Sequence, residues 1–178
     1  MQFKQLLVLA LATMSSAQQV GTQQTETHPT LSVSSCTTSS GCTAETKDIV
    51  LDANWRWTHT TGTTDNCYEG NTWSSDLCSG ECTDSDAEAA AKSCVLEGGD
   101  YEGTYGISTK SDKMEVDFVT EAWGKNIGSR SYLLDSEDKY LMFKLKNQEF
   151  TFDIDVSNLP CGLNGASARA APEARRDR

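Results

Sequence analysis

The sequence predicts an all-β protein whose antiparallel sheets pack face to face. Residues 149–156 alternate apolar and polar side chains without a break, and residues 113–119 do the same around Met114. Residues 140–145 form an apolar run between polar turns. Because successive side chains of a strand point to opposite faces, such alternation indicates strands with one buried and one solvated face. Half-buried strands of this kind are typical of antiparallel sheets that cover each other's apolar faces.

The first 17 residues have the pattern of a secretory signal peptide. Lys4 supplies a positive charge, residues 6–12 form an apolar run too short to span a bilayer, and residues 15–17 are small, as a cleavage site requires. A short anchor helix is the alternative. No other stretch approaches transmembrane length. We therefore expect a secreted, extracellular protein whose mature chain begins at Gln18.

Residues 52–59, Asp-Ala-Asn-Trp-Arg-Trp-Thr-His, hold two tryptophans on either side of an arginine. On a strand, Trp55 and Trp57 would point to one face and Arg56 to the other. Such tryptophans are either buried in a core or exposed as a platform for the apolar face of a sugar ring, whose hydroxyl edge suits Arg, Asn and Asp. The octapeptide alone leaves both interpretations open.

Seven cysteines in an exported chain predict disulfide bonds, and the odd number leaves one thiol over. Six of them lie between residues 36 and 94, in sequence rich in Gly, Ser, Thr and Asn that could not hold itself by a core alone. Zinc is the competing interpretation, since Cys78 and Cys82 have a plausible ligand spacing, but the histidines are too distant and export favours oxidation. We expect disulfides, no metal and no other cofactor.

Residues 84–93 are the one segment with a helical pattern, with Thr83 or Asp84 as the cap and an Ala-rich body. No internal repeat, dinucleotide fingerprint or phosphate-binding loop occurs. The formal net charge of −11 repels nucleic acid phosphates and suits a neutral substrate. The sequence thus predicts a β protein with one short helix that binds neither nucleic acid nor membranes.

The last twelve residues change in character. Residues 167–178 lack apolar periodicity and aromatic side chains, carry a positive balance, and follow a turn at residues 162–166 that leads towards another strand. A disordered basic tail is one interpretation. A shifted reading frame or a retained intron that ended the true sequence early is the other, and the resemblance described next favours it.

Long blocks of distinctive sequence follow one another along residues 18–166. They are Thr27–Pro29, Asp52–His59, Asn66–Trp73, Thr104–Ile107, Asn126–Arg130, Tyr132–Leu133, Glu149–Val156 and Leu159–Ala166. These blocks resemble the N-terminal part of fungal glycoside hydrolase family 7, the family of the cellobiohydrolases and endoglucanases. The resemblance covers less than half of the family's catalytic domain, so we expect residues 18–166 to be an N-terminal fragment of that domain.

The resemblance implies a concanavalin-like antiparallel β-sandwich, or jelly roll, which is incomplete here and whose concave face holds a cellulose chain. Trp57 is similar in position to the tryptophan platform of the family. The other residues that match positions on or near the substrate path are Asn54, Arg56, Tyr68, Asn126, Arg130 and Asn164. Arg and Asn donate to sugar hydroxyls, and aromatic rings cover pyranose faces. Trp55 fits the core.

The resemblance also implies how the cysteines pair. Three bridges would join Cys36 with Cys42, Cys67 with Cys94, and Cys78 with Cys82. In the family, the cysteine at Cys161 pairs with a residue far downstream, and this chain has no counterpart of that partner. We therefore expect a free thiol at Cys161, which explains the odd count.

The catalytic carboxylates of the family lie in a Glu-x-Asp-x-x-Glu strand, and this motif does not occur in the 178 residues. Retaining hydrolysis needs two carboxyls about 5 Å apart across the scissile bond. Glu115 and Asp117 begin a similar pattern, but Thr120 stands where the second Glu is required. We expect both carboxylates to lie on a solvated strand face, and we expect no catalytic residue in this chain.

Three functional hypotheses remain open at this point. The first is a secreted cellulase-family glycosidase that hydrolyses β-1,4-glucosidic bonds with retention, present here as an inactive fragment. The second is a carbohydrate-binding sandwich fragment without catalysis. The third is a small disulfide-stapled secreted protein without a ligand. The first two imply a cellulose or other β-1,4-glucan chain as partner, and a monomer if the chain is soluble.

Overall fold

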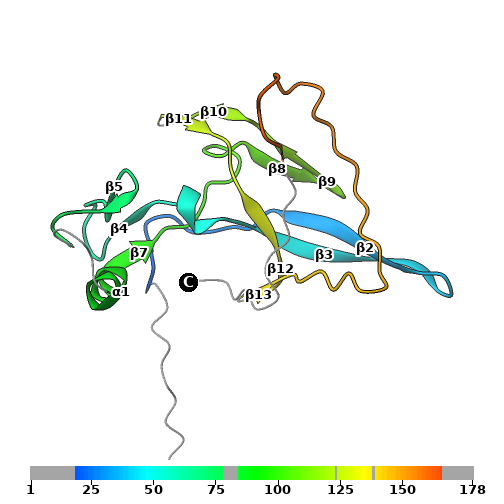
Figure 1. Cartoon of the computed structure of the whole chain (residues 1–178), viewed down its shortest axis with the longest axis horizontal. Coiled ribbons are helices and arrows are strands. Elements are labelled where there is room, and N and C mark those ends of the chain that lie inside the picture. Colours follow the sequence, from blue (N-terminus) through cyan, green and yellow to red (C-terminus); the bar gives the residue numbers. More distant parts are fainter. Residues whose placement is uncertain (1–18, 78–83, 123, 138, 166–178) are drawn as a thin grey trace, which may run out of the picture.

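The protein is built from short β-strands and one α-helix (Figure 1), as the computed structural model of residues 19–77, 84–122, 124–137 and 139–165 describes. In chain order the elements are β1 (Gln19–Val20), β2 (Thr30–Thr37), β3 (Gly41–Leu51), the 3-10 helix η1 (Ala53–Trp55), β4 (Thr58–Thr60), β5 (Tyr68–Glu69), β6 (Thr72–Trp73), α1 (Asp84–Ser93), β7 (Cys94–Leu96), β8 (Ile107–Lys110), β9 (Lys113–Val116), β10 (Val119–Glu121), β11 (Lys125–Ile127), β12 (Ser131–Ser136) and β13 (Lys139–Tyr140). The predicted all-β fold is confirmed, and so is a helix over residues 84–93.

The largest sheet has the antiparallel strand order β13-β12-β3-β2. Its centre is the long β2–β3 hairpin, in which Cys36 lies opposite Cys42 and the two sulfurs form a disulfide next to the turn. The last three residues of β3, Ile49 to Leu51, are all buried. Because β12 pairs with this buried end, the sheet brings residues 130–132 next to residues 50–52.

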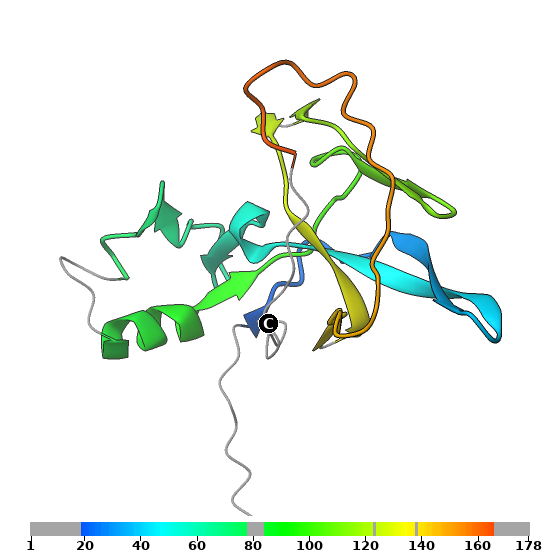
Figure 2. The ribbon, with the colours of Figure 1, turned by 45° about the vertical axis from the view of Figure 1, so that its right-hand side comes forward.

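A second sheet has the order β1-β7-β4, with β7 in the middle. All three residues of β7 are buried, and α1 runs directly into this strand. Strand β1 pairs with β7 in parallel and β4 pairs with it antiparallel. Figure 2 shows α1 and β7 on the opposite side of the molecule from the tip of the β2–β3 hairpin.

The main core forms where the β8–β9 hairpin lies over β2 and β3 (Figure 1). Its buried members are Ile49, Leu51, Tyr101, Tyr105 and Ile107. The Ser32 N–H donates to the Ser111 carbonyl at 2.9 Å and ties the two layers together. Each large apolar side chain buried here contributes roughly 1.5–3 kcal/mol, so this cluster anchors the loop of residues 52–57 that follows β3.

Residues 149–156 are not a strand, although their alternation is the clearest in the sequence. Phe150, Phe152, Ile154 and Val156 are exposed, and residues 141–165 run outside the sheets in both views (Figures 1 and 2). A strand needs a neighbouring strand edge for its backbone hydrogen bonds, and this segment pairs with none of the described strands. Of the apolar run at residues 140–145, only Tyr140 lies in a strand.

The predicted strand over residues 113–119 is interrupted at Asp117 and Phe118. Gly106 directly precedes β8 and has a φ of +62°. This conformation turns the segment before β8 away from the continuation of β9. The β8–β9 ladder therefore ends at the Ile107–Val116 pair, and the chain continues into the separate β10–β11 hairpin. Met114 packs against the core as predicted, whereas Val116 and Phe118 are exposed.

The predicted signal peptide (residues 1–17), the predicted Cys78–Cys82 bond, the helix cap at Thr83 and the basic tail (residues 167–178) lie outside the described residues. Within the described part of the chain, no helix has the length and apolar character needed to cross a membrane.

Candidate functional site

The loop of residues 52–57 is a 3-10 turn rather than the strand that the Trp-Arg-Trp alternation suggests. The Asp52 carboxylate accepts a hydrogen bond from the Asn54 N–H at 2.8 Å and caps the turn, and the Trp55 N–H donates to the Asp52 carbonyl at 3.0 Å. Aspartate is a strong cap because its short side chain accepts from N–H groups that have no partner inside the turn. The turn separates the two tryptophans, so they do not form a buried pair.

Asp52 also gathers two side chains from β12 and the residue before it. Arg130 Nε donates to Asp52 Oδ2 at 2.7 Å, and the Tyr132 hydroxyl donates to the same oxygen at 2.9 Å. Burial acts to raise the pKa of Asp52, but the bonds from Arg130, Asn54 and Tyr132 outweigh it and hold that pKa below its usual range. The carboxylate is therefore charged and fixes the position of the Arg130 guanidinium.

Trp55 belongs to the core side of the turn. Its ring packs against the main core, and the Tyr105 hydroxyl donates to its carbonyl at 2.5 Å. The Arg130 guanidinium carbon lies 5.2 Å from the ring centroid, which is a cation–π distance. The expectation that Trp55 fits the core agrees with this placement, and the exposed part of Arg130 lies next to it.

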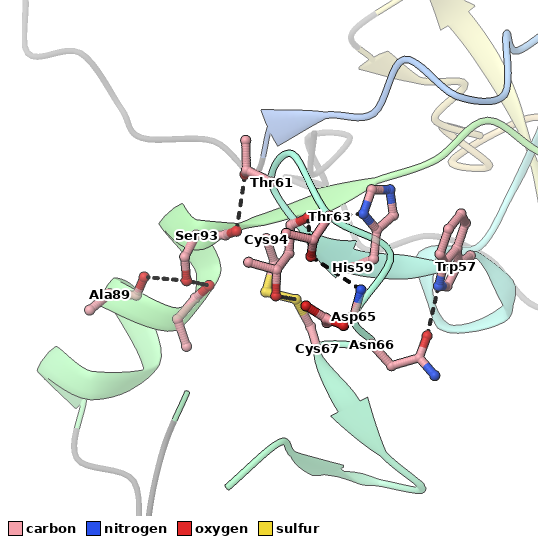
Figure 3. The surroundings of a disulfide bond; sticks show 12 residues. Trp57, His59, Thr61, Thr63, Asp65, Asn66, Cys67, Ala89, Ser93 and Cys94 are labelled. Atoms are coloured by element: carbon pink, nitrogen blue, oxygen red, sulfur yellow. Dashed lines mark hydrogen bonds between the residues drawn. A yellow bond between two sulfur atoms is a disulfide. The ribbon is translucent and has the colours of Figure 1, made fainter. Parts of the chain in front are cut away.

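Trp57 is exposed, with 39% of its surface open to solvent. Its indole Nε1 donates to Asn66 Oδ1 at 2.8 Å (Figure 3). The ring centroid lies 4.1 Å from that of His59, and the two planes are inclined by only 30°. One side of the indole therefore rests on the imidazole, its edge is held by an amide, and part of the residue faces water.

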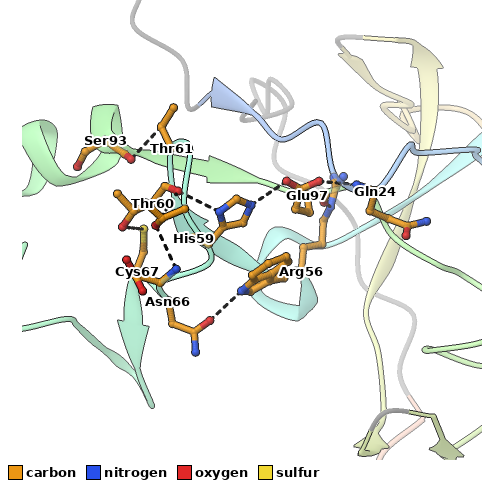
Figure 4. Close-up of polar contacts among 12 residues, drawn as sticks. Gln24, Arg56, His59, Thr60, Thr61, Asn66, Cys67, Ser93 and Glu97 are labelled. Atoms are coloured by element: carbon orange, nitrogen blue, oxygen red, sulfur yellow. Dashed lines mark hydrogen bonds and ion pairs between the residues drawn. The ribbon is translucent and has the colours of Figure 1, made fainter.

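The imidazole under Trp57 belongs to a buried charged pair (Figure 4). His59 Nε2 lies 2.7 Å from Glu97 Oε1, and both side chains are only 2% exposed. Burial opposes the charge on each group. The hydrogen bond between them and the backbone hydrogen bonds that each group makes, to Thr60 for His59 and to Gln24 for Glu97, together outweigh burial, so that the pKa of His59 is raised and the pKa of Glu97 is lowered. The Gln24 N–H completes the site by donating to Glu97 Oε2 at 2.8 Å.

Arg56 points away from solvent, and its side chain is only 5% exposed. Its Nη2 donates to Glu26 Oε2 at 2.5 Å and its Nε donates to the Glu97 carbonyl at 2.9 Å. Glu26 also accepts a bond from the Tyr101 hydroxyl at 2.7 Å. Arg56 thus joins Glu26 of the N-terminal segment to Glu97, which directly follows β7.

The remaining predicted site residues lie on separate segments of the chain. Tyr68 is exposed on the β5–β6 hairpin and stacks on Trp73 with ring centroids 4.3 Å apart. Asn126, on β11, donates its side-chain amide to the Gly128 carbonyl at 3.0 Å. Asn164 is exposed in the last described segment, and Asn54 is exposed on the turn. Within the described residues, Asn126 and Asn164 make no hydrogen bond to the group around Asp52 and Trp57.

Two of the three disulfides that the resemblance implies are present. Cys36–Cys42 closes the β2–β3 hairpin, and Cys67–Cys94 joins the segment before β5 to the start of β7 (Figure 3). Cys161 is a free, exposed thiol. In the part of the chain that the structure describes, no group of three or more His, Cys, Asp or Glu side chains is arranged to hold a metal ion.

Comparison with known proteins places this arrangement in a family. The sequence model of glycosyl hydrolase family 7 matches residues 20–170. The chain belongs to this family. Residues 19–165, which include all of the described residues, therefore fall almost entirely within a family 7 domain.

Solved family 7 structures are similar to the chain over about two thirds of its length. A cellobiohydrolase from Daphnia pulex is 41% identical with a TM-score of 0.57, covering 66% of this chain and 26% of that protein. A cellobiohydrolase from Melanocarpus albomyces complexed with cellotetraose is 42% identical with a TM-score of 0.61, covering 71% and 28%. An endocellulase from Humicola insolens is 29% identical with a TM-score of 0.51, covering 66% and 28%. The chain thus spans little more than a quarter of these proteins.

Sequence reasoning did not find the residues that hold Trp57 and Arg56 in place, namely Glu26, Asn66 and Glu97. Glu97 is the one with a usable signal, because an acidic residue directly follows the apolar run Cys94–Leu96 and a buried charge requires a partner. Which residue supplies that partner depends on the β4–β7 pairing, which sets His59 opposite Val95, and no local pattern encodes that register.

Proposed function

We propose that this family 7 chain forms part of a secreted cellulase-type glycosidase, and that it binds a β-1,4-glucan chain. The observation that carries the proposal is Trp57: it is an exposed tryptophan, held in place from one side, in a chain that belongs to glycosyl hydrolase family 7. The apolar face of a pyranose ring stacks on such an indole. The cellotetraose in the Melanocarpus albomyces protein supports a β-1,4-glucan as the ligand class.

Polar groups near the turn would supply hydrogen bonds to the sugar hydroxyls. Asn54 is exposed next to Trp55, and nearly half of the Arg130 side chain is open to solvent while Asp52 fixes its Nε. A guanidinium held in this way has lost much of its rotamer freedom before the ligand arrives, which lowers the entropic cost of binding. Tyr68, Asn126 and Asn164 are further proposed contacts of a long glucan chain. We assign Arg56 to the support of the site.

We further propose that hydrolysis by the family proceeds with retention, and that these 178 residues alone do not catalyse it. Retention requires a nucleophilic carboxylate and a second carboxyl that donates a proton. The sequence holds no Glu-x-Asp-x-x-Glu motif. Glu115, the residue that begins the most similar pattern, is exposed on β9 and pairs with Lys113, and this pair lowers its pKa. A charged, solvated carboxylate is a poor proton donor.

Titration with cellohexaose and release of reducing sugar together test the proposal. We expect the 178-residue chain to bind cellohexaose, the Trp57→Ala variant to bind at least about fivefold more weakly, and neither protein to release sugar. Loss of a stacked aromatic contact is worth roughly 1–3 kcal/mol, which is about 5- to 150-fold. The Glu115→Gln variant serves as the control and should bind unchanged.

Three outcomes of this experiment bear on the hypotheses. Sugar release that disappears in Glu115→Gln would overturn the assignment of that residue to a solvated face. Binding without sugar release is also what a pure carbohydrate-binding fragment would show. Absence of binding in the unaltered chain would refute the proposed ligand class.

A further inference from the structure

Trp57 is held by two side chains, a buried one beneath the ring and an exposed one at its edge. His59 lies under the indole with ring centroids 4.1 Å apart, and its own exposure of 2% keeps it out of reach of any ligand. Asn66 holds the edge of the ring through the 2.8 Å bond from Nε1. A stack fixes the tilt of the ring and a bond at its edge fixes its rotation, so together they define the plane of the indole.

The imidazole is itself fixed because both of its nitrogens face acceptors. Nδ1 lies 3.0 Å from the Thr60 carbonyl and Nε2 lies 2.7 Å from Glu97 Oε1. A carbonyl oxygen and a carboxylate oxygen only accept, so each nitrogen carries a proton and the ring is an imidazolium. A cation against an indole face adds a cation–π attraction to the stacking. The ring below Trp57 is therefore anchored at two points and is attractive to the indole.

The N-terminal segment covers the charged pair and locks Glu97. The Gln24 N–H donates to Glu97 Oε2, and the Gly21 N–H donates to the Leu96 carbonyl at 2.8 Å. A Cβ on Gly21 would lie 2.0 Å from Glu97 Oε1, so only glycine allows this close approach. The support of Trp57 thus extends from the exposed indole through His59 and Glu97 to residues 21–24.

We propose that His59 and Asn66 are positioning residues that preset the plane of the Trp57 indole for a glucan ring. This inference rests on the proposed function for its ligand, and it adds the residues that set the geometry of the platform. Part of Trp57 stays exposed while it is held in this way, so a sugar ring would stack on it without a change in the side chain. Fixing a side chain before binding is worth about 2- to 12-fold in affinity.

Binding of cellohexaose by the full chain measures the effect on affinity. We expect about fivefold weaker binding for Asn66→Ala and for His59→Gln, within the range for one preset side chain. Asn71→Ala, on the exposed β5–β6 turn, is the matched control for the first variant. His28→Gln changes the only other histidine and is the control for the second. Both controls should bind like the unaltered chain. Asn66 lies at the surface, so we expect Asn66→Ala to fold. This variant therefore tests the proposal even if His59→Gln does not fold.

The indole N–H resonance of Trp57, assigned by its loss in Trp57→Phe, gives a readout that needs no ligand. We expect Asn66→Ala to shift this resonance and to speed exchange of the proton with water, while the midpoint of thermal unfolding stays unchanged. An unshifted resonance, or unchanged affinity with a shifted one, would overturn the proposal. If the unaltered chain binds no cellohexaose, the proposed function fails, and the resonance alone then decides whether His59 and Asn66 hold the ring.

Discussion

Replacing Arg56 distinguishes a structural role for this side chain from a direct role in glucan binding. The guanidinium is 5% exposed, forms a 2.5 Å ion pair with Glu26 and donates to the Glu97 carbonyl at 2.9 Å. Arg56→Met keeps the apolar stem and removes the charge. Removing one partner of a buried pair costs about 3–5 kcal/mol because the other charge loses its compensation. Since Glu26 keeps some contact with water, we expect the lower end, about 3 kcal/mol.

Urea denaturation followed by circular dichroism measures this cost, and a double-mutant cycle isolates the pair. Glu26→Gln keeps an acceptor for the Tyr101 hydroxyl, which donates to Glu26 at 2.7 Å. We expect a coupling free energy of about 2 kcal/mol between Arg56→Met and Glu26→Gln. Lys92→Met is the control, because Lys92 forms an exposed i,i+4 pair with Glu88 and such pairs are worth less than about 0.5 kcal/mol.

The opposite result would support a direct contact between Arg56 and glucan. If Arg56 contacts glucan, Arg56→Met would leave the free energy of unfolding within about 0.5 kcal/mol, as surface substitutions do, and would abolish cellohexaose binding. Zero coupling to Glu26 would likewise refute the buried ion pair.

Three further outcomes are expected from the same structure. Because the pKa of Glu97 is lowered and the pKa of His59 is raised, their contribution to stability should be complete between about pH 4.3 and 6.5. This contribution should be lost as pH falls through the folded-state pKa of Glu97 or rises through that of His59. If urea melts across a pH series gave the same pH dependence for the unaltered chain and for His59→Gln, they would contradict this expectation. Removing the Cys67–Cys94 bond, which joins residues 27 apart, should lower the free energy of unfolding by about 3.5 kcal/mol. Removing the Cys36–Cys42 bond, which joins residues only 6 apart, should lower it by about 2 kcal/mol. Equal shifts in thermal midpoint would argue against this dependence on loop length. The exposed stretch at residues 149–156 should bind a hydrophobic dye, and Phe152→Asp should reduce that fluorescence without lowering the thermal midpoint.

The features that follow from local sequence were the ones that sequence reasoning predicted. An Ala-rich segment with an acidic start gave the helix at Asp84–Ser93, and its ten residues need no distant partner for their backbone bonds. In contrast, the turn at Asp52 was missed because the Trp-Arg-Trp alternation carries the same pattern as a strand. The capping signal Asp-Ala-Asn was present in the sequence, and it decides the conformation because Asp52 bonds the Asn54 N–H.

The site depends on pairings between distant segments, which residue patterns do not encode. His59 reaches Glu97 only because β4 pairs antiparallel with β7, and Arg56 reaches Glu26 only because residues 21–26 lie along β7. In each case a charged residue next to an apolar run indicates that a partner exists, but not which one. The proposal that Trp57 is a platform came from family resemblance, while the residues that hold its ring came from the contacts.

Residues 149–156 illustrate the limit of periodicity most clearly. Alternation determines which side chains share a face once a strand forms, because the side-chain period of a strand is two. It does not supply the neighbouring edge, and each residue of a strand needs that edge to satisfy its N–H and C=O groups. The segment pairs with none of the described strands, and Phe150 and Phe152 pack on each other with ring centroids 5.4 Å apart while both remain exposed. The alternating pattern therefore specifies an apolar face whose conformation depends on what pairs with the segment.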